Sequence, residues 1–112
     1  MKHTNESEIP WVERQSPRGR FHLFRRHISQ ALGAPFDVGV AGGGHPFDVE
    51  LVRLPPGATN FPLHAHAAQW EFYIIRDGSG EVRTDQATVP ISAGDVFVCP
   101  PRDAHQLKNT GS

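Results

Sequence analysis

The sequence predicts an all-β fold, an antiparallel sandwich or barrel built from short strands. Apolar runs of strand length recur from Phe47 onward and are rich in aromatic or β-branched residues. Turn chemistry separates these runs at Pro55–Gly57, Asp77–Gly80 and Ser92–Asp95. Many short strands with regular turns and little helix favour packed or closed antiparallel sheets.

The N-terminal part is expected to hold an arm and one short helix. Residues 1–19 are charged and interrupted by proline and glycine, so we interpret them as an arm with Trp11 as its packing anchor. From Phe21 to Leu32 apolar residues fall at helical spacing, and Gly33 fits a helix C-cap. The pattern predicts a short amphipathic helix there, followed by a glycine connector over residues 39–44.

Four strands are predicted after this connector. Residues 47–54 alternate apolar with charged side chains, which is the period of a half-buried strand. Residues 69–76 form a second apolar run, and Asp77–Gly80 has the composition of a hairpin turn that leads into a returning strand at residues 81–84. Residues 96–99 complete the predicted set.

Size and charge exclude several classes of protein. The chain has 112 residues, enough for one small domain. It carries 11 Lys and Arg against 12 Asp and Glu, a net charge of -1, so no electrostatic footprint for nucleic acid or an anionic membrane is present. The arginines between residues 18 and 26 are interpreted as a solvated face.

The single cysteine is compatible with a reducing compartment but does not identify one. Cys99 has no partner within the chain for a disulfide, which fits a cytoplasmic protein. It lies in an apolar run and is expected to be a buried hydrophobe, with a catalytic thiol as the alternative. The polar N-terminus shows no signal peptide, and the apolar runs are too short to span a bilayer.

One group of residues has the composition of a metal site. His64 and His66 are two positions apart, so on an extended segment both rings point to the same face. Glu71 has the opposite parity, which a bulge at residues 67–68 would correct, and His105 could arrive from a neighbouring strand. Three imidazoles and a carboxylate suit Mn, Fe, Co, Ni, Cu or Zn. An octahedral ion would keep open positions, whereas tetrahedral zinc would be closed and structural.

These residues lie in a pattern that resembles the two sequence motifs of the cupin superfamily. In the first motif, His64-x-His66 is followed after four residues by Glu71 and after six more by Gly78. Gly57 matches the opening glycine of that motif with one extra residue before His64.

The second motif starts at Gly94, reaches Pro100 after five residues, and continues to His105 and then Asn109. Arg102 is a departure, because the family has glycine there, and it puts in doubt whether this loop can adopt a positive φ. The two motifs at the family's separation make the resemblance specific over residues 47–109.

The resemblance implies a jelly-roll β-barrel with the metal in its mouth. It makes His64, His66, Glu71 and His105 the metal ligands, the motif glycines turn residues, and Asn109 a loop-closing residue. We therefore expect a single domain over residues 1–112, with the arm and helix in 1–45 and the barrel core in 46–112. Tyr73 shares the parity of Glu71 and is a weak catalytic candidate, with a packing aromatic as the alternative.

The end of the chain raises a further expectation. A cupin barrel normally has another strand after the second motif, and its absence would leave a neighbouring strand without hydrogen-bond partners. Residues 1–45 could fill the gap, a partner chain could do so as a homodimer, or the barrel is truncated at its C-terminus. We favour a truncated or atypical member.

Two classes of function follow from the resemblance. The first is a small metal-dependent enzyme that oxidises, isomerises or cleaves a small polar substrate. The alternative is a non-catalytic module that binds a small molecule or uses the metal for stability. The sequence gives no second base of assured position, so it does not choose between them.

Overall fold

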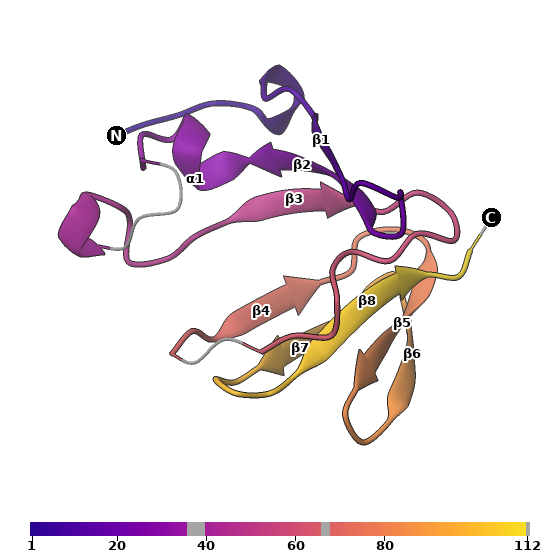
Figure 1. The fold of residues 1–112 in the computed structure, drawn as a ribbon. Coiled ribbons are helices and arrows are strands. Elements are labelled where there is room, and N and C mark those ends of the chain that lie inside the picture. Colours follow the sequence, from indigo (N-terminus) through magenta and orange to yellow (C-terminus); the bar gives the residue numbers. More distant parts are fainter. Residues whose placement is uncertain (36–39, 66–67, 112) are drawn as a thin grey trace. The chain divides into compact units, whose positions relative to one another are not determined.

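The computed structural model describes residues 1–35, 40–65 and 68–111 (Figure 1). Strands are the main regular structure in these residues and helix is scarce, which confirms the predicted all-β class. The helical elements are η1 (Glu6–Glu8), α1 (Ile28–Ala31) and η2 (Val40–Gly42). The strands are β1 (Val12–Gln15), β2 (His22–His27), β3 (Glu50–Arg53), β4 (Glu71–Ile74), β5 (Ser79–Thr84), β6 (Thr88–Ser92), β7 (Val96–Cys99) and β8 (His105–Asn109).

The chain divides into two compact units. The first joins Met1–Arg14 with Phe24–Arg53, and the second joins Gln15–Leu23 with Leu54–Ser112. The assignment of residues 1–112 to a single domain stays a prediction.

The first unit is built on the sheet β1-β2-β3. Strand β2 pairs antiparallel with β3, from Phe24 opposite Arg53 to His27 opposite Glu50. The indole of Trp11 lies 4.4 Å from the guanidinium carbon of Arg26 and 4.7 Å from that of Arg53, which are cation–π distances. These contacts hold the N-terminal segment, as expected of a packing anchor.

The predicted extent of the helix in the N-terminal part is wrong. The helix predicted over Phe21–Leu32 is a strand from His22 to His27, and only Ile28–Ala31 is helical. The predicted arm contains strand β1. Apolar residues four positions apart suggested a helix, but antiparallel pairing with β3 satisfies the backbone of β2 instead, and tertiary pairing outweighs weak local periodicity.

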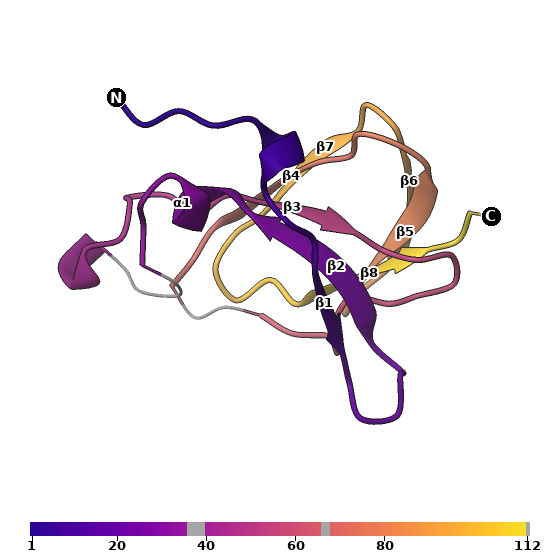
Figure 2. The same ribbon diagram turned by 90° about the horizontal axis from the view of Figure 1, so that it is seen from above.

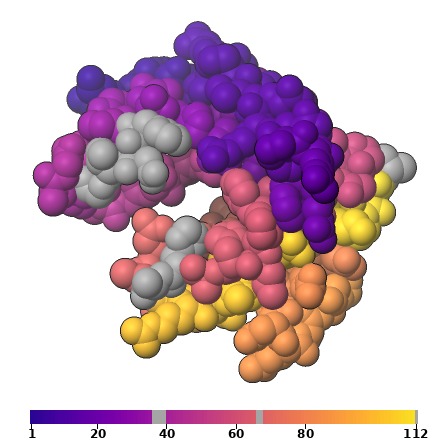
Figure 3. Space-filling view, in the orientation of Figure 1, coloured from indigo at the N-terminus to yellow at the C-terminus, as the bar shows by residue number. Residues whose placement is uncertain are grey.

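The second unit contains two sheets, β4-β7 and β6-β5-β8 (Figure 2). Strand β4 runs antiparallel to β7, with Glu71 opposite Cys99 and Tyr73 opposite Phe97. Strand β5 pairs with β6 on one side and with β8 on the other. The segment that follows β3 runs beside β8 (Figure 3). There the Asn60 N–H donates to the Leu107 carbonyl at 3.0 Å.

The predicted hairpin across Asp77–Gly80 is wrong, because β4 and β5 belong to different sheets. The Ile75 N–H donates to the Asp95 carbonyl, and the Gly94 N–H donates to the Ile75 carbonyl. Within the turn, the Gly78 carbonyl accepts from the Ala93 N–H at 3.1 Å, so the turn bonds to the segment before β7, and the chain then enters the other sheet. Strand β6 was not predicted. It contains Pro90 and lies at a sheet edge, where proline is tolerated.

The turns of the two motifs have the expected backbone. Gly57, Gly78 and Gly94 have φ values of 78°, 81° and 93°, in the left-handed region that glycine adopts without a steric cost. Arg102 reaches the same region with φ 70°, so the loop does adopt a positive φ without glycine. The Asn109 side chain donates to the Leu54 carbonyl at 2.8 Å and closes the expected loop.

Candidate metal centre

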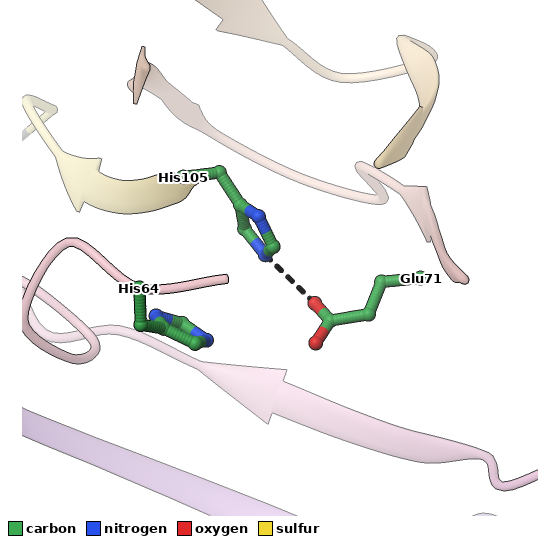
Figure 4. Close-up of side chains that lie close together, drawn as sticks. All are labelled: His64, Glu71 and His105. Carbon is green, nitrogen blue, oxygen red and sulfur yellow. Dashed lines mark hydrogen bonds and ion pairs between the residues drawn. The ribbon is translucent and has the colours of Figure 1, made fainter. Parts of the chain in front are cut away.

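Three side chains from separate parts of the second unit point toward one another (Figure 4). His64 precedes β4, Glu71 is the first residue of β4, and His105 is the first residue of β8. One ligand atom from each lies within 4.8 Å of the others, so the group could hold a metal ion. It is the one such cluster of histidine, cysteine or acidic residues within residues 1–35, 40–65 and 68–111.

Backbone pairing places the two histidines side by side. His64 and His105 form an isolated antiparallel bridge. The His105 N–H donates to the His64 carbonyl at 2.8 Å, and the His64 N–H donates to the His105 carbonyl at 3.3 Å. Directly opposed residues put their side chains on one face of the ladder. The ring centroids are consequently 4.9 Å apart.

Main-chain carbonyls orient both imidazole rings. Nδ1 of His64 lies 2.9 Å from the Pro62 carbonyl oxygen, and Nδ1 of His105 lies 2.8 Å from the Asp103 carbonyl oxygen. A carbonyl oxygen only accepts, so each Nδ1 carries the hydrogen. In a neutral ring the lone pair is then on Nε2, and this is the outer-shell arrangement by which proteins fix metal-binding histidines.

The surroundings of His105 Nε2 fit a cation. The Glu71 carboxylate oxygen Oε2 is 2.8 Å from this nitrogen, and the Tyr73 hydroxyl oxygen is 3.2 Å from it. The Tyr73 hydroxyl donates its only hydrogen to Glu71, so it offers a lone pair to His105. Electron-rich atoms therefore converge on one point, which requires either a proton on Nε2 or a bound cation. The residues present fit a divalent metal.

Burial strengthens this argument. His105 is 1% exposed, and the Glu71 side chain is 23% exposed. A shielded carboxylate is costly unless it is paired or binds a metal. A divalent ion bonded to the imidazole and the carboxylate would satisfy both groups together.

Three of the four predicted metal ligands are among the described residues. The structure brings together His64, Glu71 and His105, whereas His66 and the expected bulge at residues 67–68 involve positions outside the described residues. The assignment of these residues as metal ligands stays a prediction. The carbonyls of Pro62 and Asp103 were missed, and no sequence signal could have found them, because every residue carries a carbonyl.

Cys99 is buried, as expected, and does not have the character of a nucleophile. It is 5% exposed. Burial, followed by the nearby charges of Asp103 and Glu71, raises the pKa of the thiol from 9.0 to about 11. The thiol is therefore protonated at neutral pH, which disfavours a catalytic thiolate.

Among the described residues, no helix is long and apolar enough to cross a membrane.

Relatives of the chain were found among curated proteins and solved structures. The chain is 38% identical over 61 residues to the oxalate-binding protein of Thermotoga maritima, a match that covers 54% of this chain and 50% of that protein. The chain thus spans about half the length of this curated relative.

Two solved structures are similar over nearly the whole chain. The first is a predicted oxalate decarboxylase from Thermotoga maritima, with 28% identity, a TM-score of 0.74, and coverage of 96% of this chain and 87% of that chain. The second is a sugar phosphate isomerase of the cupin superfamily from Silicibacter pomeroyi, with 27% identity, a TM-score of 0.73, and coverage of 96% and 67%.

A third solved structure supports the fold alone. It is a cupin 2 conserved barrel domain protein from Salinispora arenicola, with 22% identity, a TM-score of 0.59, and coverage of 98% of this chain and 76% of that chain.

The family model described as the cupin domain matches residues 50–112, which contain the clustered histidines and carboxylate. The chain belongs to the cupin superfamily and has its strand-rich jelly-roll fold.

Proposed function

We propose that this cupin binds a divalent transition metal ion through His64, His66, Glu71 and His105, and that the ion in turn binds a small carboxylate ligand. His66 enters the set through its motif position two residues after His64. Borderline nitrogen ligands with one carboxylate suit Mn, Fe, Co, Ni, Cu or Zn.

The observation that carries the proposal is the environment of His105 Nε2. Its ring is fixed through Nδ1 by the Asp103 carbonyl at 2.8 Å, and Nε2 faces the Glu71 carboxylate at 2.8 Å. A histidine used only for packing has no need of a carboxylate at one nitrogen and a carbonyl at the other. The same Nδ1 contact at His64, 2.9 Å from the Pro62 carbonyl, repeats the arrangement.

A carboxylate ligand is favoured by charge and by the relatives. A divalent ion held by neutral imidazoles and one carboxylate keeps a net positive charge, so an anion is the matching ligand. One relative is named for binding oxalate and another as a predicted oxalate decarboxylase. When bound, the metal would supply a Lewis acid that polarises ligand oxygens.

Catalysis is the second candidate function. The similarity to a predicted decarboxylase and to a sugar phosphate isomerase favours a lyase or isomerase step on a small polar substrate, and oxidation is a further reaction class of the expected enzyme. Formate release from oxalate by the metal-loaded protein would support the lyase. Oxalate binding without product would support the binding module.

The binding proposal is tested by calorimetric titration of oxalate into metal-loaded protein. We expect saturable binding with one oxalate per chain, lost when the metal is removed and lost in His105→Ala. Phe72→Leu is the matched control, because Phe72 is 67% exposed and lies next to Glu71 on the opposite face of β4. Equal oxalate binding with and without metal would contradict the proposal.

Two expectations from the sequence stay predictions alongside this proposal. A cytoplasmic location would be checked by cell fractionation. A homodimer would be checked by size-exclusion chromatography with light scattering.

A further inference from the structure

We propose that Tyr73 is a positioning residue of the metal centre, which fixes the Glu71 carboxylate through a hydrogen bond from its phenolic hydroxyl. This inference rests on the proposed metal function and concerns how tightly and in what geometry the ion is held. It replaces the weak catalytic role that parity alone gave to Tyr73.

The hydrogen-bond pattern of the hydroxyl carries the inference. A phenol has one hydrogen, and the Tyr73 hydroxyl donates it to Oε2 of Glu71. That hydrogen is therefore not available to His105 Nε2, which lies 3.2 Å from the same oxygen. The hydroxyl hydrogen is bonded to the carboxylate, so this hydrogen bond restricts the orientation of the Glu71 side chain.

The ring of Tyr73 is itself held in place. Tyr73 is directly opposite Phe97 in the β4-β7 register, and the two rings are stacked with centroids 4.6 Å apart and planes 12° apart. The Tyr73 ring also meets the His105 ring edge to face, with centroids 5.9 Å apart. A hydroxyl on a ring packed on two sides is a fixed donor.

The position of Tyr73 on the strand completes the argument. Tyr73 and Glu71 are two residues apart on β4, so their side chains share a face. A glutamate has three side-chain torsions, and their freedom opposes metal binding unless something restricts them. A hydrogen bond to one oxygen restricts the carboxylate before the ion arrives.

The test compares the affinity of apo-protein for Co²⁺ in wild type and in Tyr73→Phe. This substitution keeps the stacked ring and removes only the hydroxyl. Loss of an outer-shell partner typically weakens metal binding about 10- to 100-fold, and we expect a rise of that size in the Kd for Co²⁺. The visible absorption of bound Co²⁺ should also change, because that spectrum reports ligand geometry, and a role in packing alone would leave it unmoved.

Two further variants make the test specific. Phe97→Leu keeps the hydroxyl but removes the stacked ring beneath it, so we expect a smaller rise in Kd with the same direction of spectral change. Phe72→Leu alters the opposite face of the same strand and should leave both Kd and spectrum at wild-type values. Thermal melts of the apo-proteins would check that each variant is folded.

The outcomes separate this inference from the proposed function. If wild type binds one Co²⁺, His105→Ala does not, and Tyr73→Phe matches wild type in Kd and spectrum, the positioning role is overturned while the metal centre stands. If wild type binds no Co²⁺, or His105→Ala binds it equally well, both fall. A weakened Tyr73→Phe with an altered spectrum supports both.

Discussion

In the β4-β7 sheet the face with the polar side chains is the more buried one and the apolar face is exposed, which is the reverse of an ordinary half-buried sheet. One face carries Glu71 and Tyr73 on β4, opposite Cys99 and Phe97 on β7. The other face carries apolar residues that are 50–67% exposed, namely Phe72, Ile74, Val96 and Val98. In most antiparallel sheets the apolar face packs on the core and the polar face meets water.

On the more buried face, the polar side chains have to find hydrogen-bond or ionic partners. The face that includes buried Cys99 and half-buried Tyr73 also holds a carboxylate that contacts a 1% exposed histidine. Shielded polar groups lower stability unless they are satisfied. The polar groups of this face are satisfied by one another and, on our account, by a cation.

The largest expected effect is on metal content, which should be lost when the histidine ligands are removed and kept when the exposed apolar face is changed. His64→Ala with His66→Ala, or His105→Ala alone, should abolish stoichiometric metal measured by elemental analysis, because ligands are removed. Phe72→Leu should keep the metal content of wild type. Full metal content in the histidine variants would remove the assigned ligands.

Removal of the ion by a chelator should show how far the bound metal stabilises the folded protein. A ligand that binds only the folded chain raises the unfolding free energy by about 4 kcal/mol when present at about 1,000 times its Kd. Addition of a chelator should therefore lower the Tm of metal-loaded wild type. The Tm of His105→Ala should not respond, and an equal drop in both proteins would contradict the account.

Cys99 gives a chemical measure of how well the same face is shielded. Its pKa is raised from 9.0 to about 11, so at pH 8 the folded chain has about 100-fold less thiolate than the unfolded chain. Alkylation by iodoacetamide should be slower in native protein than in urea by at least that factor. Similar rates would show that the face is open.

The same shift predicts a dependence of stability on pH. The raised pKa means that the folded state favours the protonated thiol. The contribution to stability is fully present below pH 9 and is lost as pH rises toward 11. Cys99→Ala should lose this part of the alkaline dependence in urea titrations followed across that range.

Arg102 tests the turn that leads from β7 to His105. A residue other than glycine in the left-handed region costs about 1–2 kcal/mol, whereas glycine adds about 0.5–1 kcal/mol of unfolded-state entropy. With φ at 70°, Arg102→Gly should therefore raise the unfolding free energy by about 0.5–1 kcal/mol. Arg102→Ala keeps the strain and should give no gain in urea denaturation.

The smallest effect is expected on the exposed apolar face. Ile74→Thr and Val98→Thr keep β-branched side chains at positions 63% and 50% exposed. Each should change the unfolding free energy by less than about 0.5 kcal/mol in urea melts and leave metal content intact. A loss above about 2 kcal/mol would show that this face is buried in the protein in solution.

The sequence predicted the strands whose signals are local. Residues 96–99 and the core of 69–76 are strands as expected, because β-branched and aromatic runs bounded by turns determine them. The hairpin at Asp77–Gly80 failed because pairing between β4 and β7 depends on contacts about twenty-five residues apart, which composition does not encode. The strand at His22–His27 was mistaken for helix for the same reason.

The candidate site was predicted in part for a different reason. Motif spacing selects His64, Glu71 and His105, and these side chains converge in the structure. Spacing could not show that Tyr73 donates to Glu71, since that contact depends on the stacked ring of Phe97 from β7. It could not show the carbonyl partners of the two histidines either.

The most direct test is a crystal structure of the protein grown with Mn²⁺, with anomalous diffraction data. The proposed ligand set predicts a single strong anomalous peak about 2.0–2.3 Å from Nε2 of His64, Nε2 of His105, a ring nitrogen of His66 and a carboxylate oxygen of Glu71. A map with no peak there, or with the ion bound at other residues, would contradict it.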